Sequence, residues 1–276
     1  MSILTEAKQQ DRTPPIMTIC GDAGSGKTSL AAMSPKPFII RTQGEGVPLD
    51  AKQKPVGLAP IGGKRKAVND EVSIWDETEL WDQLGALLKD KHDFKTVIVD
   101  STSGLEALFV QNVLDVQPAK QKTMNAAGSG YGSAWDIVAA KHMRVKKAAE
   151  YLRDRRGMNV IFIAHVDVER MDPPDGEPYS KYGLQLHKKT APTYINNVDL
   201  VGFLKQETFT VGDGDVKKAK TSDARILVTQ MGPAQVSKNR LGIEQDLRVP
   251  KGENPLLKYM SGGIELLKEM ENEKSE

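Results

Sequence analysis

The residues with the clearest chemistry form a glycine-rich stretch near the N-terminus that ends in lysine and threonine. The stretch fits the pattern G-x-x-x-x-G-K-[ST], follows the apolar run Ile16–Cys20 and opens the helical pattern Lys27–Met33, which is the context that this motif requires. Glycines let backbone N–H groups surround phosphates, Lys27 reaches the β- and γ-phosphates, and the Thr28 hydroxyl ligates Mg²⁺. We therefore predict a site for ATP and Mg²⁺ made of Gly21, Asp22, Ala23, Gly24, Ser25, Gly26, Lys27, Thr28 and Ser29.

A second apolar run, Val97–Val99, ends in the acid Asp100. Ligands of open α/β sheets bind at the carboxyl ends of the strands, so Asp100 is expected to hold the Mg²⁺ and its water shell. The next residue is Ser101, whereas many P-loop ATPases place a water-activating glutamate there. If this protein hydrolyses ATP, the carboxylate must therefore come from a neighbouring strand.

Glu45 is the best candidate for that carboxylate, because it lies four residues past the run Phe38–Arg41 with a glycine on either side. A tight turn there could aim it at the γ-phosphate, and a solvated loop glutamate is the alternative. His165 directly follows the run Asn159–Ala164 and could sense the γ-phosphate by hydrogen bonding. For His165 the alternative is a histidine whose hydrogen bonds are satisfied within the fold.

Two cations, Lys238 and Arg240, flank an asparagine in the run Lys-Asn-Arg-Leu-Gly. They could reach a phosphate in a neighbouring subunit, as an arginine finger does. From these residues alone, a surface charge cluster is the favoured interpretation.

Two long polar segments, Gln117–Gly132 and Asp167–Pro192, could contact nucleic acid. Loops of this length within a compact domain are usually functional or disordered. Their lysines could bind phosphates and a tyrosine could stack on a base, while a solvated surface is the alternative for each residue. The candidates are Lys120, Lys122, Tyr131, Lys188 and Lys189.

Five short apolar runs alternate with helical patterns, which predicts an α/β fold with a doubly wound, mainly parallel sheet. The predicted strands are Ile16–Cys20, Phe38–Arg41, Thr96–Asp100, Asn159–Ala164 and Val198–Leu204. The predicted helices are Lys27–Met33, Glu77–Lys89, Ser103–Val116 and Ala134–Arg155. An antiparallel hairpin, Leu204–Val211 with Arg225–Gln230, extends the sheet, and a last helix covers Asn254–Glu271. The Gly- and Lys-rich segment Thr42–Asn69 is expected to be a loop.

Composition limits the kinds of partner and the cellular location that we expect. The 38 basic residues nearly balance the 37 acidic ones, so any surface for nucleic acid must be a local patch. A single cysteine excludes an internal disulfide, and no run of about 18 apolar residues predicts a membrane span, so we expect a cytoplasmic protein. We expect a flexible segment at 1–15, an ATPase core at 16–250, and a helix with a charged tail at 251–276.

Together these motifs resemble RecA-type ATPases, in particular the short phage-encoded RecA-like ATP-binding proteins related to the RadA branch. The resemblance covers about Ile16 to Gly242. It rests on the P-loop, on Asp100 followed by Ser101, on the remote Glu45 and on His165 at a strand end. It also rests on the Lys-Asn-Arg-Leu-Gly run, which is similar to the Lys-Asn-Arg-Phe-Gly motif of bacterial RadA.

The resemblance implies the strand order 5-1-4-3-2, assembly into a homo-oligomeric ring or filament, and DNA-binding loops that face its axis. In such an assembly Lys238 and Arg240 would complete the nucleotide site of a neighbour. The implied activity is Mg²⁺-dependent ATP hydrolysis on single-stranded DNA in phage recombination, annealing or replication, in the cytoplasm of a bacterial host. A single-strand-binding protein is a further partner that the resemblance admits.

Two other functions remain open at this point. A nucleotide or small-molecule kinase would need a lid of clustered arginines, and the one cluster lies on the wrong side of the fourth strand for such a lid. That cluster comprises Arg153, Arg155 and Arg156. A slow nucleotide-dependent switch that binds a protein partner fits the missing acid after Asp100.

Overall fold

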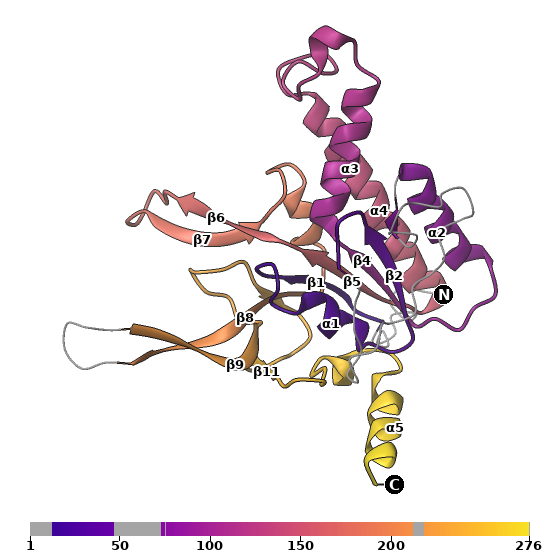
Figure 1. Ribbon diagram of the computed structural model, residues 1–276, viewed down its shortest axis with the longest axis vertical. Helices are drawn as coiled ribbons and strands as arrows, with labels where there is room; N and C mark the ends of the chain where they lie inside the picture. The colour runs from indigo at the N-terminus through magenta and orange to yellow at the C-terminus, as the bar shows by residue number, and fades with distance from the viewer. Residues whose placement is uncertain (1–12, 47–72, 75, 212–217, 276) are drawn as a thin grey trace, which may run out of the picture.

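The computed structural model describes residues 13–46, 73–74, 76–211 and 218–275, and within them the chain folds around one large mixed sheet (Figure 1). Its strands are β1 (Ile16–Cys20), β2 (Pro37–Thr42), β3 (Ser73–Ile74), β4 (Thr96–Asp100), β5 (Asn159–Ala164), β8 (Leu200–Val211), β9 (Lys218–Val228), β10 (Lys238–Asn239) and β11 (Leu247–Val249). Their order is β11-β9-β8-β1-β5-β4-β2-β3, and β10 also pairs with β8. The central five strands, β8-β1-β5-β4-β2, are parallel to one another and confirm the predicted order 5-1-4-3-2.

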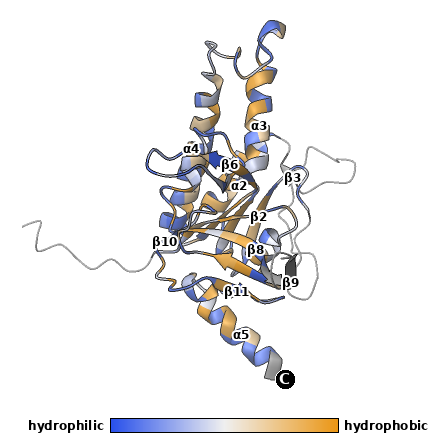
Figure 2. Cartoon of the chain, turned by 90° about the vertical axis from the view of Figure 1, so that its left-hand side faces the viewer, coloured by the Kyte–Doolittle hydropathy of each residue, from blue (hydrophilic) through white to orange (hydrophobic). Residues whose placement is uncertain are grey.

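Both faces of the sheet are covered, which is why most residues of its central strands are apolar (Figure 2). Successive residues of a strand point to opposite faces. One face packs against α2 (Glu77–Lys89), α3 (Thr102–Asp115) and α4 (Ala134–Arg156). The other packs against α1 (Lys27–Ala32) and the short helix η4 (Leu257–Tyr259), and the last helix, α5 (Gly263–Ser275), extends away from the body (Figure 1).

Local capping fixes where the helices begin and end. The Asp76 side chain accepts a hydrogen bond from the Glu79 N–H at 2.9 Å at the start of α2, and Ser101 does the same for Gly104 at 3.0 Å at the start of α3. Gly157 ends α4 in the left-handed conformation. Ser101, the cap of α3, is therefore the single residue between the end of β4 at Asp100 and the start of α3 at Thr102.

The segment Asp167–Pro192 was expected to be an irregular loop, and this prediction is wrong. It contains an antiparallel ribbon of β6 (Val166–Met171) and β7 (Tyr179–Leu184) that projects from the body (Figure 1). Most residues of β6 are exposed, so its charged sequence lacks the apolar run of a buried strand. The Pro- and Gly-containing turn between two alternating stretches is the signal of a hairpin.

Two predicted boundaries also move. β8 is one strand of 12 residues that pairs with β1 and then with β9, rather than two strands that meet at Leu204. The helix predicted from Asn254 begins at Gly263, because the Asn254 amide donates to the Leu30 carbonyl at 3.1 Å and anchors the preceding segment on α1. The loop after Gly46 and the hairpin turn at Gly212–Asp215 lie outside the described residues, and the division at 15 and 250 stays a prediction.

Candidate nucleotide site

The predicted phosphate and metal residues meet at one edge of the sheet, where β1, β5, β4 and β2 end. The P-loop follows β1, Asp100 ends β4, and Glu45 and His165 follow β2 and β5. The strands are in register there, because Asp100 lies opposite both Ile163 and Arg41. The sheet therefore brings Glu45 and His165, which are 120 positions apart in the chain, within hydrogen-bond distance of each other.

Lys27 is buried inside the P-loop. Its ammonium donates to the carbonyls of Gly21 at 2.9 Å and Asp22 at 2.8 Å, and the loop closes with a bond from the Ser25 N–H to the Asp22 carbonyl. Burial lowers the pKa of Lys27, while the nearby charges of Asp100 and Glu45 oppose that shift. The ammonium therefore lies at the base of the loop, beside two carboxylates.

Thr28 and Asp100 form the predicted metal pair. The Thr28 hydroxyl donates to Oδ2 of Asp100 at 2.7 Å. The other oxygen of Asp100, Oδ1, is buried and has no hydrogen-bond donor in the described structure. A buried oxygen without a donor is costly, and a hydroxyl beside a carboxylate is an oxygen donor set that Mg²⁺ accepts. The two residues therefore fit Mg²⁺, which when bound would neutralise charge on the phosphates.

Burial raises the pKa of Asp100 to about 6, and the charge of Glu45 acts in the same direction. The Thr28 hydrogen bond and the charge of Lys27 oppose the shift. A proton consequently competes with a cation for Asp100 in mildly acidic solution.

Glu45 lies where the spacing predicts it, in a tight turn after β2. Gly44 has a φ of 89°, the Glu45 N–H reaches the Thr42 carbonyl at 3.3 Å, and Nη1 of Arg41 donates to the Glu45 carbonyl at 2.9 Å. These contacts aim the carboxylate at Ser101, whose hydroxyl donates to Oε1 of Glu45 at 2.5 Å. Nε2 of His165 lies 3.2 Å from the same oxygen.

Burial alone would raise the pKa of Glu45, but the hydrogen bonds from His165 and Ser101 and the charges of His165 and Lys27 lower it below its usual value. The carboxylate is therefore ionised at neutral pH, which is the state that a general base needs.

Hydroxyl groups join the ends of the neighbouring strands. Thr42 accepts from the Ser101 N–H at 3.0 Å and donates to the Asp100 carbonyl at 3.2 Å, which connects β2 with β4. Thr102 donates to the Ile163 carbonyl at 3.1 Å, and Ser103 accepts from the His165 N–H at 3.2 Å, which connects α3 with β5. The relative positions of Asp100, Glu45 and His165 are thus fixed by short polar contacts.

The structure shows a role for Ser101 that sequence reasoning missed. Its hydroxyl both caps α3 and donates to Glu45. Ser101, which occupies the position after Asp100, therefore orients the carboxylate of Glu45. The only sequence signal is a cap residue directly after the strand that ends in Asp100.

Lys238 and Arg240 lie away from this edge. Lys238 in β10 pairs with Val201 near the start of β8, and its ammonium donates to the carbonyls of Ile195 and Asn196. Burial and the charge of Arg240 lower the pKa of Lys238. Arg240 is exposed. The two cations therefore lie beside the amino end of β8, remote from the P-loop of their own chain.

The candidates for DNA contact lie on exposed surface beside α4. Lys120 and Tyr131 are exposed in the loop between α3 and α4, with the Tyr131 side chain fully accessible. Lys122 is exposed, and its ammonium donates to the carbonyls of Leu114 and Asp115, at the C-terminal end of α3. Such carbonyls are stabilised by a cation, so Lys122 also has a structural role.

The second candidate segment lies beside the start of α4. Lys189 makes an ion pair of 2.7 Å with Asp136, and the His187 ring stacks on Trp135 with centroids 4.0 Å apart. Lys188 is exposed on the same segment. The fold thus attaches the segment after β7 to the helix that follows the first loop.

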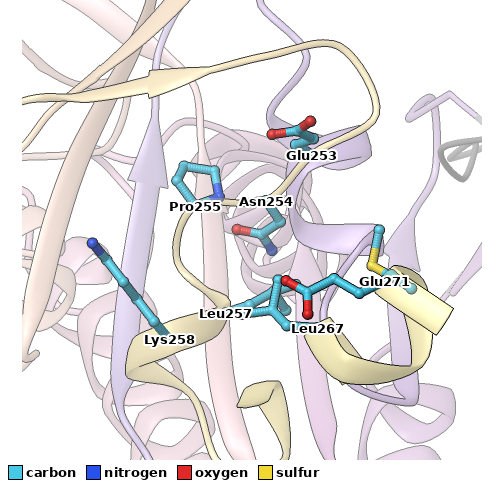
Figure 3. A pocket seen from close by; sticks show the side chains of 8 residues that line it. Glu253, Asn254, Pro255, Leu257, Lys258, Leu267 and Glu271 are labelled. Atoms are coloured by element: carbon cyan, nitrogen blue, oxygen red, sulfur yellow. The ribbon is translucent and has the colours of Figure 1, made fainter. Parts of the chain in front are cut away.

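A pocket of about 330 Å³ lies between α5 and the segment around η4 (Figure 3). Apolar side chains such as Pro255, Leu257 and Leu267 line it, and none of the phosphate or metal residues reaches it. Its polar lining residues, Glu253, Asn254, Lys258 and Glu271, belong to neither the P-loop nor the strand ends.

The fold and the site define an α/β P-loop nucleotide-binding domain. A family model described as "AAA domain" matches residues 13–241, which is most of the chain, so the protein belongs to this family of AAA-type P-loop ATPase domains. Comparison with curated proteins finds no match. The relation to the RecA and RadA branch and a phage origin stay predictions. No helix in the described residues is long and apolar enough to cross a membrane.

Proposed function

We propose that the protein is a Mg²⁺-dependent ATPase that acts on single-stranded DNA. The observation that carries this proposal is the Glu45 carboxylate, which the Ser101 hydroxyl holds at 2.5 Å at the end of β4, next to the Thr28–Asp100 pair. The ionised carboxylate of Glu45 lies at this edge and can activate water, which many P-loop ATPases do with a glutamate directly after the strand-end aspartate.

In the proposed reaction Glu45 takes a proton from water as the water oxygen attacks the γ-phosphorus. The bond from that phosphorus to the β-γ bridging oxygen breaks, and the products are ADP and inorganic phosphate. Lys27 stabilises the charge on the β- and γ-phosphates, and Thr28 and Asp100 hold the metal ion. His165 would report whether a γ-phosphate is present, through its contact of 3.2 Å with Glu45.

The surface around α4 supports DNA as the partner. Tyr131 offers a fully exposed ring, and the loop and segment described above add four exposed lysines, Lys120, Lys122, Lys188 and Lys189. Aromatic rings stack on bases of any sequence, and lysines pair with phosphates, so this combination suits a single strand. The β6–β7 ribbon begins directly after His165, which gives a covalent connection from the nucleotide site to an exposed element.

We also propose a homo-oligomer. The exposed Arg240 and its neighbour Lys238 lie too far from their own P-loop to act there, so a phosphate of a second subunit is the anion that they would meet. Sizing the protein with and without a non-hydrolysable ATP analogue tests this point, since a strict monomer under both conditions contradicts it.

The test of the function is the rate of ATP hydrolysis with and without single-stranded DNA. We expect hydrolysis by the wild-type protein, stimulation by DNA, and a loss of hydrolysis in Lys27→Ala. Tyr131→Ala should reduce the stimulation several-fold, whereas Val116→Ala, which truncates another exposed side chain in the same region, should not. Hydrolysis that DNA does not stimulate would contradict a role on DNA. Phosphorylation of an added acceptor would indicate a kinase. If the protein binds ATP but shows neither activity, a nucleotide-dependent switch is the remaining function.

A further inference from the structure

Arg225 of β9 places a cation directly against the P-loop. A Cβ atom built on Gly26 would lie only 2.2 Å from Nη1 of Arg225 and 3.4 Å from its Cζ. The guanidinium therefore lies against Gly26, the residue that precedes α1. Neither the P-loop motif nor the acids at the strand ends point to this contact.

The pairing of β8 with β9 places Arg225 next to Gly26. Leu227 pairs with Leu204, and Arg225 pairs with Gln206 two positions further along. Since residues two apart in a strand share a face, Arg225 continues the face on which Leu204 and Leu227 pack with Leu30 of α1. The buried leucines thus fix the register that leaves Arg225 at the rim of the core.

A pocket of about 350 Å³ opens along the P-loop, before Gly26. Residues Asp22 to Ser25 of the P-loop form one wall, and Lys205 and Gln206 at the end of β8 form another. Tyr182 and Phe203 close the pocket, with ring centroids 5.1 Å apart. There is consequently open space between the P-loop and β8.

The electrostatic surroundings of Arg225 favour an anion. Within the described part of the chain the guanidinium of Arg225 makes no hydrogen bond and no ion pair, although the residue is partly buried. Arg248 on the adjacent strand β11, by contrast, pairs with Glu207 at 3.0 Å. The N–H groups of a P-loop already attract anions, so a second positive group beside them is unfavourable until a negative ligand is present.

We propose that Arg225 is a phosphate-binding residue of the nucleotide site, contributed by the same chain that supplies the P-loop. In this motif the backbone surrounds the α- and β-phosphates, whereas the lysine reaches the β- and γ-phosphates. Because Arg225 contacts the backbone at Gly26, it serves the diphosphate part of the nucleotide, which ADP and ATP share. The inference rests on the proposed function only in that a nucleotide binds at the P-loop.

The test compares the Kd values of ADP and of a non-hydrolysable ATP analogue, both with Mg²⁺. Arg225→Ala should weaken both about tenfold, because a charge-assisted hydrogen bond to phosphate is lost. Arg225→Lys should fall between wild type and Arg225→Ala, since the charge remains and the bidentate geometry does not. The matched control Arg248→Ala should stay within about twofold of the wild type, because its guanidinium is paired with Glu207 on the surface.

Arg225→Gln keeps most of the side-chain stem and removes the charge, so it separates loss of binding from loss of packing. Melting temperatures measured without nucleotide check that each variant folds. Unchanged Kd values in Arg225→Ala and Arg225→Gln would overturn the inference, and so would weakening of the ATP analogue alone. If the wild-type protein binds neither nucleotide, the proposed function itself is wrong.

Discussion

The metal-binding function that we propose for Asp100 conflicts with the stability of the folded protein. Its side chain is fully buried, and one of its oxygens lacks a donor in the described structure, so the protonated acid is more favourable in the folded protein than in the unfolded chain. A metal ion needs the ionised form. The raised pKa therefore measures a cost that the fold carries when no cation is bound.

We predict that Asp100→Asn stabilises the protein in the absence of Mg²⁺ and nucleotide, and that it abolishes hydrolysis. The pKa of Asp100 is raised from 3.8 to about 6, so the folded state binds the proton more tightly than the unfolded state. Its contribution to stability is complete below the unfolded pKa and is lost as the pH rises through about 6. The variant should gain about 1–3 kcal/mol of unfolding free energy at pH 8 and much less at pH 4.5.

Urea unfolding of both proteins in EDTA at the two pH values measures this difference. The wild-type protein at pH 4.5 is the internal control, because its Asp100 is already largely neutral there. A stability difference that does not change with pH would show that burial of the Asp100 charge is not its cause.

At the scale of elements, the start of α3 fixes the geometry of the site. Gly104 lies in the first turn of α3, so close to Thr42 that an added Cβ would lie 2.1 Å from the Thr42 hydroxyl oxygen. That hydroxyl connects β2 with β4, and the Ser101 cap of the same turn holds Glu45. One close approach between a helix and a strand therefore supports both carboxylates.

We predict that Gly104→Ala lowers the unfolding free energy by about 1–3 kcal/mol, because the methyl group must displace Thr42. Hydrolysis should fall as well, since Glu45 and Asp100 lose their common support. Gly85→Ala is the matched control, for an added Cβ there meets nothing within 4 Å and the change should stabilise α2 by up to about 1 kcal/mol. Thermal unfolding and initial rates of ATP hydrolysis check both variants, and equal effects of the two changes would contradict this explanation.

At the scale of the whole molecule, the sequence specifies the central sheet and most of the nucleotide site. Apolar runs indicate buried parallel strands, and the motif at Gly21–Thr28 predicts a phosphate-binding loop. Glu45 could be found because a missing acid after Asp100 directs attention to the next strand end. The predicted strand order is confirmed, and the P-loop, Asp100 and Glu45 lie at one sheet edge, because both depend on local patterns and on the rule that ligands bind at the carboxyl edge. The roles of these residues stay predictions.

Other parts depend on pairings that no local pattern records. The ribbon β6–β7 is mostly exposed and is buried only where it joins the body, so its strands show no apolar run, and only the turn between two short alternating stretches indicates a hairpin. Arg225 reaches Gly26 only through the register of β9 on β8, and the role of Ser101 depends on a side chain from β2. Contacts of this kind join residues far apart in the chain and become visible only once the strands are paired.

The central claim is that Glu45, held by Ser101, activates the water that hydrolyses ATP. The most direct measurement is the single-turnover rate of ATP hydrolysis by Glu45→Gln, together with its Kd for ATP and Mg²⁺. We predict a rate about 100-fold or more below that of the wild type and a Kd within a few-fold of it, because the amide cannot accept the proton. Glu244→Gln, which changes an exposed glutamate away from the site, should hydrolyse ATP at the wild-type rate. An unchanged rate in Glu45→Gln with ATP still bound would contradict the claim.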